Sequence, residues 1–185
     1  MKLGNSHLPV LLDDMDAAFS ALKTAVSADP AGWTRAPAGK WSAGQHAEHL
    51  ALSLEEPLKR LEQSLLELRE GALGPRPNRG IAQALVIRML MREPFPRGGK
   101  AAPFALPGPT PSRESVFARL DAGRARLRRI VESLTPEERD RLWLLNPFME
   151  KRRWHYRLFE MVRIQATHTR HHTRQVVAAA RSSPR

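Results

Sequence analysis

Apolar residues recur at alternating steps of three and four residues in four long stretches of this 185-residue chain. That spacing aligns them along one side of an α-helix, which has about 3.6 residues per turn. No stretch shows the sustained two-residue alternation that is typical of strands. The pattern therefore predicts an all-α protein, in which residues 1–185 form a single domain that folds as a four-helix bundle.

The first two predicted helices lie in the N-terminal 70 residues, and the first of them ends near Asp29. The second follows Trp41, where Ser42 and Gln45 form a capping box, in which each side chain satisfies a free backbone N–H group of the other residue. Pro57 is expected to kink this helix, because a proline ring displaces the carbonyl group one turn earlier. The apolar stripe of the first helix comprises Leu8, Leu12, Met15, Phe19, Leu22 and Val26. The stripe of the second comprises His46, Leu50, Leu54, Leu58, Leu61, Leu65 and Leu68.

The other two predicted helices lie in the C-terminal half of the chain. The third begins near Ser112, and the last spans about Trp154 to Ala180. Between them, Thr135 followed by Pro136 and Glu138 has the cap, first-turn proline and acid that predict a short helix. The stripe of the third helix comprises Val116, Leu120, Gly123, Leu127, Ile130 and Leu134.

A segment rich in glycine and proline, residues 71–112, connects the second and third predicted helices. It holds 14 of the chain's 26 glycines and prolines. Gly80–Met91 is expected to form a short helix, and Glu93–Pro111 is expected to be irregular. A connection of this length allows the second and third helices to run parallel, and long irregular segments often carry function.

The chain has a formal net charge of +11. This charge is distributed as −3 over residues 1–70, +5 over 71–112, +5 over 113–157 and +4 over 158–185, so it is not gathered into one basic arm. The absence of cysteine excludes disulfides, thiolate metal sites and a cysteine nucleophile.

Neither a signal peptide nor a membrane span is expected. Met1–Val10 lacks the apolar core of a signal peptide. The most apolar stretch, Ile81–Met91, is shorter than a membrane span and is interrupted by Arg88. We therefore expect a cytoplasmic protein without a membrane partner.

Two groups of histidines fall on predicted helices. In the last helix, His168 and His172 are one turn apart on the inward side, whereas His171 is rotated by about 100° and is expected at the surface. Two imidazoles with this spacing can each give one nitrogen to a single metal ion. In the second helix, His46 and His49 are also one turn apart, and either can supply a third ligand if the two helices are neighbours.

Three neutral histidines with an open position are typical of a reactive metal site rather than a closed structural one. Such sites bind zinc, nickel, iron or copper, and the ligand type alone does not select among them. A core packing role without metal is the alternative interpretation of the same histidines. No His-Glu-x-x-His motif supports zinc-protease chemistry.

Two motifs resemble the DinB-like superfamily, which includes metal-dependent hydrolases and S-transferases that use bacillithiol, mycothiol or glutathione. They are Trp41-Ser42-x-x-Gln45-x-x-x-His49-Leu50-Ala51-x-Ser53 and His168-x-Arg170-His171-His172-x-x-Gln175-Val176. The resemblance covers nearly the whole chain and implies an up-down-down-up bundle. It also implies that His49, His168 and His172 are the metal ligands, whereas His46 lies outside the match and lines the cavity or packs.

The resemblance further implies a metal-dependent hydrolase or thiol S-transferase that uses a divalent transition metal (zinc, nickel or iron) and acts on a small molecule. A low-molecular-weight thiol would have to arrive as a cosubstrate, because the chain has none of its own. Gln45, Glu48 and Gln165 are candidate acceptors for the ligands' N–H groups or candidate bases, although Glu48 also fits an ordinary solvated position. No catalytic residue is assigned.

Further residues are candidates for substrate contact. Arg170 and Arg174 flank the histidines and either meet an anionic substrate or form a solvent face. The Glu93–Pro111 segment is a candidate lid, with contacts expected from Phe95, Phe104 and Leu106.

The alternative function is a basic helical protein that binds nucleic acid or another partner without catalysis. Its basis is the arginine-rich third helix, with Arg119, Arg124, Arg126, Arg128 and Arg129. These arginines are scattered and interrupted by acidic residues, and no nucleic-acid-binding motif is present, so nucleic acid is not the expected partner. The sequence also leaves open two further possibilities. The chain could form a homodimer through the outer helix faces, or it could keep the bundle fold without catalytic activity.

Overall fold

The computed structural model describes residues 4–36, 38–96 and 98–181. Its α-helices are α1 (Leu8–Ala28), α2 (Ala43–Arg69), α3 (Ile81–Leu90), α4 (Arg113–Ser133), α5 (Pro136–Arg141) and α6 (Leu158–Arg181). Its 3-10 helices are η1 (Asn5–His7), η2 (Pro30–Trp33), η3 (Pro103–Ala105) and η4 (Pro147–Arg152), and its strands are β1 (Trp143–Leu145) and β2 (His155–Arg157).

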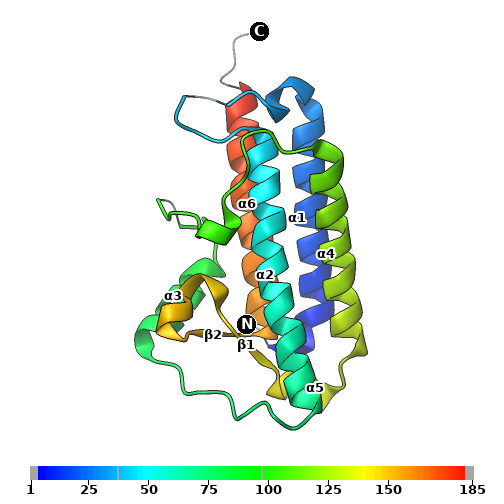
Figure 1. Cartoon of the computed structure of the whole chain (residues 1–185), viewed down its shortest axis with the longest axis vertical. Helices are drawn as coiled ribbons and strands as arrows, with labels where there is room; N and C mark the ends of the chain where they lie inside the picture. The colour runs from blue at the N-terminus through cyan, green and yellow to red at the C-terminus, as the bar shows by residue number, and fades with distance from the viewer. Residues whose placement is uncertain (1–3, 37, 97, 182–185) are drawn as a thin grey trace.

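The four long helices α1, α2, α4 and α6 pack side by side as the predicted all-α bundle (Figure 1). The chain runs upward in α1 and α6 and downward in α2 and α4 in Figure 1. Helix α1 packs mainly against α6, and α2 packs against both α4 and α6. The contact between α2 and α6 brings the two groups of histidines to the same level of the bundle.

The predicted apolar stripes form most of the core, but in α4 Val131 is buried, whereas the predicted Ile130 is only partly buried. Every stripe residue of α1 is buried, and so are the leucines of the α2 stripe. Removing one such leucine side chain typically costs about 2–5 kcal/mol, because part of the cavity stays open. The core residues from α4 and its C-terminus are Val116, Leu120, Leu127, Val131 and Leu134.

Side-chain caps begin the helices where the sequence predicts them. Ser42 Oγ accepts a hydrogen bond from the Gln45 N–H at 3.2 Å, and Gln45 Oε1 accepts one from the Ser42 N–H at 3.0 Å. Ser112 caps α4, and Thr135 forms a capping box with Glu138 at the start of α5. Helix α2 continues through Pro57 as one helix.

The predicted start of the last helix at Trp154 was wrong, and so was the expectation of no strands. Residues 155–157 instead pair antiparallel with residues 143–145, and α6 begins at Leu158. Arg153, with φ 52°, adopts the left-handed conformation, which ends a helix locally. Three-residue strands are too short for a two-residue alternation to be recognised in sequence.

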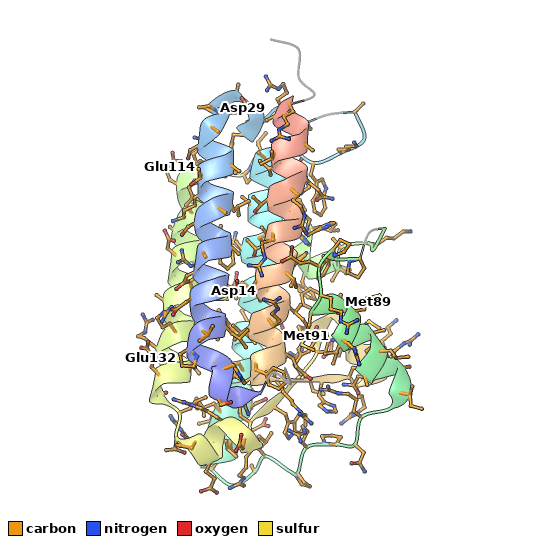
Figure 2. The ribbon with its side chains drawn as sticks, turned by 180° about the vertical axis from the view of Figure 1, so that it is seen from behind. Asp14, Asp29, Met89, Met91, Glu114 and Glu132 are labelled. Atoms are coloured by element: carbon orange, nitrogen blue, oxygen red, sulfur yellow. The ribbon has the colours of Figure 1, made fainter. Side chains whose placement is uncertain are left out.

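The 71–112 connection contains the predicted short helix, α3, and one 3-10 turn, η3. Elsewhere between Glu93 and Pro111, the described residues form no helix or strand, as expected. The end of α3 is held against α6, because Thr167 Oγ1 donates to the Leu90 carbonyl at 2.8 Å and Arg163 Nε donates to the Met91 carbonyl at 3.3 Å (Figure 2). No helix among the described residues is long and apolar enough to cross a membrane.

Candidate metal centre

The first turns of α2 hold His46 and His49, and the packing of this helix end fixes their position. The capping box at Ser42 sets where the helix begins. Gly44 allows the close approach of η2, since a Cβ atom added there would lie 2.7 Å from the Trp33 carbonyl oxygen. His46 and His49 therefore enter the bundle interior at a defined height, and both are buried.

Three histidine nitrogens converge between α2 and α6. The Nε2 atom of His168 lies 3.3 Å from that of His49 and 3.0 Å from that of His172. One ligand atom from each of the three lies within 4.8 Å of the others. Nitrogens bound tetrahedrally to one zinc ion at about 2.0–2.1 Å would be ~3.3 Å apart. The cluster has the spacing of a ligand set and could hold a metal ion.

The outward ring nitrogens of two of the three histidines, His49 and His172, also have partners. His49 Nδ1 lies 2.7 Å from the Ala105 carbonyl oxygen in η3. Because that oxygen can only accept, Nδ1 carries the proton, and the lone pair of the neutral ring remains on Nε2. A metal-bound histidine usually donates its second N–H in this way.

His172 is paired with His46 through their Nδ1 atoms, which are 2.8 Å apart. One of the two must donate. A His172 that binds a metal through Nε2 carries its proton on Nδ1 and is the donor. His46, which the DinB-like motif does not include, thus lies behind a predicted ligand and orients it.

Burial keeps these histidines neutral at pH 7. Burial, together with the smaller effect of neighbouring histidines, lowers the pKa of His46 to about 4 and that of His168 to about 3. Burial also lowers the pKa of His172 and His49, although the hydrogen bond to Ala105 partly offsets the shift of His49. A metal ion requires the neutral imidazole, because only that form offers a lone pair.

Two aromatic side chains flank the cluster. The Trp41 ring centroid lies 4.9 Å from that of His49, and Trp41 also contacts His46 and His172. Phe95 stacks on His168 with 4.9 Å between the ring centroids. Both rings cover part of the surface of the histidines that they contact.

Of the three expected lid contacts, Phe95 reaches the histidines. Phe104 packs against Phe148, and Leu106 is exposed. The Ala105 carbonyl, between those two residues, makes the direct contact with the cluster instead. No sequence signal identifies it, because a backbone carbonyl has no side-chain signature.

The side chains of Glu48 and Gln45 form hydrogen bonds to the connecting segment and not to the histidines. Glu48 Oε2 accepts a hydrogen bond from the Gly108 N–H at 2.7 Å, and Gln45 Nε2 donates to the Gly108 carbonyl at 3.2 Å. Together with the contact between His49 and Ala105, they fix residues 105–108 along α2.

Gln165 carries an unused acceptor on the face of α6 that bears the cluster. It precedes His172 by seven residues, so the two lie about 20° apart around the helix. Its Nε2 atom donates to the Ser53 carbonyl at 2.8 Å, whereas its buried Oε1 atom has no hydrogen-bond partner among the described residues. Ser53 Oγ lies 3.4 Å from His49 Nε2. A buried acceptor without a donor fits a site that binds a further group.

Arg170 and Arg174 are engaged in ion pairs. Arg170 pairs with Asp14 at 3.0 Å and Glu93 at 2.5 Å, and Arg174 pairs with Glu93 at 2.7 Å. Asp14 also binds Arg163, so it fastens α1 to α6 (Figure 2). These pairs place the two arginines in a structural network, and Glu93 holds the segment that carries Phe95.

The remaining histidines take other positions. His171 is partly buried rather than a surface residue, with its ring 5.5 Å from Phe95 and 5.2 Å from His172. His155 is buried in β2, where Gln83 donates to its carbonyl. His7 lies in η1.

The model of the DinB superfamily matches residues 11–176. This span begins within α1 and ends within α6. It includes the three histidines of the cluster and also His46. The match confirms the resemblance of the two motifs. No curated protein and no solved structure gave a significant match.

Proposed function

This chain belongs to the DinB superfamily, and on that basis we propose a metal-dependent enzyme in which His49, His168 and His172 hold a divalent transition metal. Zinc, nickel and iron suit three imidazoles. The proposal rests on the convergence of three Nε2 atoms within ligand spacing of one another. A divalent ion bound there would supply a Lewis acid that lowers the pKa of a water or thiol.

The surrounding residues orient the ligands. The Ala105 carbonyl holds the tautomer of His49, and His46 does the same for His172. Trp41 and Phe95 limit the number of water molecules around the cluster, which strengthens electrostatic interactions inside it. Gln165 Oε1 offers an acceptor to an N–H, O–H or S–H group of a bound molecule.

Transfer of a low-molecular-weight thiol to a small electrophile is the reaction that we favour. No carboxylate of the described residues hydrogen-bonds to His49, His168 or His172, and Glu48 is bound to Gly108. A thiol has a pKa near 8.5 against 15.7 for water, so it ionises without a strong base. The thiol comes from solution, because the chain contains no cysteine. Hydrolysis is the second candidate and needs a base from the substrate or solvent.

A nucleic-acid-binding function has less support. Four arginines of α4 pair with acidic residues of α1 and α2: Arg119 with Glu48 and Glu55, Arg124 with Asp16, Arg126 with Glu62, and Arg128 with Asp13 and Asp16. Paired guanidinium groups are less available for phosphates.

The experiment is a thiol-transfer assay on the full chain reconstituted with Zn²⁺, Ni²⁺ or Fe²⁺. Chlorodinitrobenzene serves as the electrophile, and bacillithiol, mycothiol and glutathione are tested in turn. We expect thioether formation above the uncatalysed rate with at least one thiol, its loss in His168→Ala and its retention in His171→Ala. No acceleration with any thiol and metal, or equal rates in wild type and His168→Ala, would contradict the proposal. Metal-dependent ester hydrolysis without any thiol effect would favour the hydrolase instead.

A further inference from the structure

A polar cavity lies toward the start of α6, away from the histidine cluster. It measures about 130 Å³ and is lined by Arg76, Pro77, Asn78, Arg79, His155 and Arg157. The first four residues belong to the connection between α2 and α3, and the last two belong to β2. Glu160, which contacts this cavity's Arg79, precedes His168 by eight residues, or about 12 Å along the helix.

Arg79 is held rigidly at the cavity. Its Nη1 and Nη2 atoms donate to the two oxygens of Glu160 at 2.6 and 2.8 Å, and Nη2 also lies 3.3 Å from the His155 carbonyl oxygen. Its Nε atom is buried and has no hydrogen-bond partner among the described residues. One donor of a fixed guanidinium group is thus left without an acceptor, which is costly in a buried position.

The other two arginines of the cavity, Arg76 and Arg157, add positive charge without an ion-pair partner among the described residues. Neither Arg76 nor Arg157 forms an ion pair with an acidic residue in the described parts of the chain, whereas Arg79 is paired with Glu160. Burial, followed by the charges of Arg157 and Arg79, lowers the pKa of Arg76, although Glu160 and Asp140 partly offset this shift. A bound anion would relieve the repulsion among these like charges.

We propose that this cavity is a binding site for a phosphate group. A phosphate dianion would give Arg76 and Arg157 the acidic partner that neither has, and its oxygens match the donor fork of a guanidinium group. The cavity is large enough to hold several water molecules, and a phosphate group could take their place.

The dipole of α3 also favours an anion near these cavity residues. This helix begins at Ile81, directly after the cavity residues 76–79 and Gly80, and no side chain caps it. Its first backbone N–H groups are therefore free of a capping side chain, and the helix dipole favours negative charge at this end.

The test is calorimetric titration of the full chain with inorganic phosphate and, separately, phenyl phosphate, at constant ionic strength. We expect one saturable site per chain for at least one of the two. Binding of both indicates that the free ion suffices, and binding of the ester alone indicates that the group must be attached to an organic molecule. The Arg76→Gln and Arg157→Gln variants should each bind about tenfold more weakly or worse, because each loses a charge-assisted hydrogen bond.

Two control variants test whether phosphate binds at this cavity and independently of the metal centre. Arg129→Gln removes one exposed charge from α4 and should bind phosphate as the wild type does. His168→Gln removes a predicted metal ligand and should also leave phosphate binding unchanged. The absence of saturable binding to both phosphates, or equal weakening in Arg129→Gln and the two cavity variants, would overturn the proposal.

Discussion

His49 Nδ1 lies 2.7 Å from the carbonyl oxygen of Ala105, a residue 56 positions further along the chain. This hydrogen bond connects the long 71–112 segment directly to a predicted metal ligand. It fixes the proton on Nδ1 and leaves Nε2 unprotonated toward His168 and His172. The conformation of an irregular segment is thereby coupled to the geometry of the metal centre.

The partner of His172 gives a first prediction. Replacing His46 with Ala removes the group that contacts His172 Nδ1 at 2.8 Å, while all three predicted ligands remain. We expect metal affinity to fall by about ten- to hundredfold at unchanged stoichiometry, as is usual when a residue that orients a ligand is lost. Competition with a chromophoric chelator measures the affinity. The matched control is His171→Ala, and a similar loss of affinity in both variants would argue against an orienting role for His46.

The attachment of the connecting segment can be tested at Glu48. Glu48→Ala removes the acceptor of the Gly108 N–H, so we expect faster hydrogen exchange of the Gly108 amide and a weaker hold on residues 105–108. Exchange followed by NMR provides the measurement. Glu56→Ala, on the same helix and paired instead with Lys59 and Arg60, serves as the control. Unchanged protection of Gly108 in Glu48→Ala would show that this contact does not hold the segment.

The start of α2 depends on a close approach at Gly44. Exchanging glycine for alanine inside a helix normally stabilises it by up to ~1 kcal/mol. Here the added Cβ atom would lie 2.7 Å from both the Trp33 carbonyl oxygen and a ring atom of Trp33, so we expect Gly44→Ala to destabilise the protein by about 1–3 kcal/mol. Denaturant unfolding measures this change. Gly74→Ala, with no atom within 4 Å of the added Cβ, is the control, and equal stabilities of the two variants would refute the argument.

The helices of the bundle were predictable from sequence, because both the spacing of apolar residues and the capping residues are local patterns. The stripes from Leu8 to Val26 and from Leu50 to Leu68 became the core, and the caps at Ser42, Ser112 and Thr135 set where three helices begin. The strand at residues 155–157 was missed because its pairing partner, not its own sequence, defines it. The left-handed backbone conformation of Arg153 likewise has no signature in the sequence.

The histidine cluster was predictable in part. The one-turn spacing of His168 and His172 indicated a shared face, but the spacing alone left His46 and His49 as equal candidates for the third position. The DinB-like motif selected His49, and the structure brings its Nε2 atom to the cluster. The roles of His46, Ala105 and Asp14 arise from contacts between distant segments, which spacing in one chain cannot reveal.

The pH dependence of stability should reveal the charge network between α1 and α4. Burial alone would raise the pKa of Asp16, but hydrogen bonds and charges from Arg128 and Arg124 outweigh it and lower the pKa below its ordinary value of 3.8. The carboxylate therefore stabilises the folded state above about pH 4, and this contribution is lost as the pH falls through the lowered pKa. We expect Asp16→Asn to cost about 1 kcal/mol at pH 7 and the stabilities of variant and wild type to converge in acid.

Thermal or denaturant unfolding between pH 7 and pH 2.5 measures this convergence. Asp13→Asn is the matched control, because Asp13 also pairs with Arg128 but its side chain is 71% exposed. It should cost only a few tenths of a kcal/mol. A constant difference between Asp16→Asn and wild type across the pH range would be inconsistent with a stabilising Asp16 carboxylate.

Metal content is the decisive measurement for the histidine cluster. Plasma mass spectrometry of protein purified without an affinity tag should find about one transition-metal ion per chain. Neither a His49→Ala/His168→Ala/His172→Ala variant nor the single variants His168→Ala and His172→Ala should retain stoichiometric metal, whereas His171→Ala should. No metal in the wild type, even after reconstitution with zinc, nickel and iron, would contradict a metal centre and leave the histidines as residues of the core.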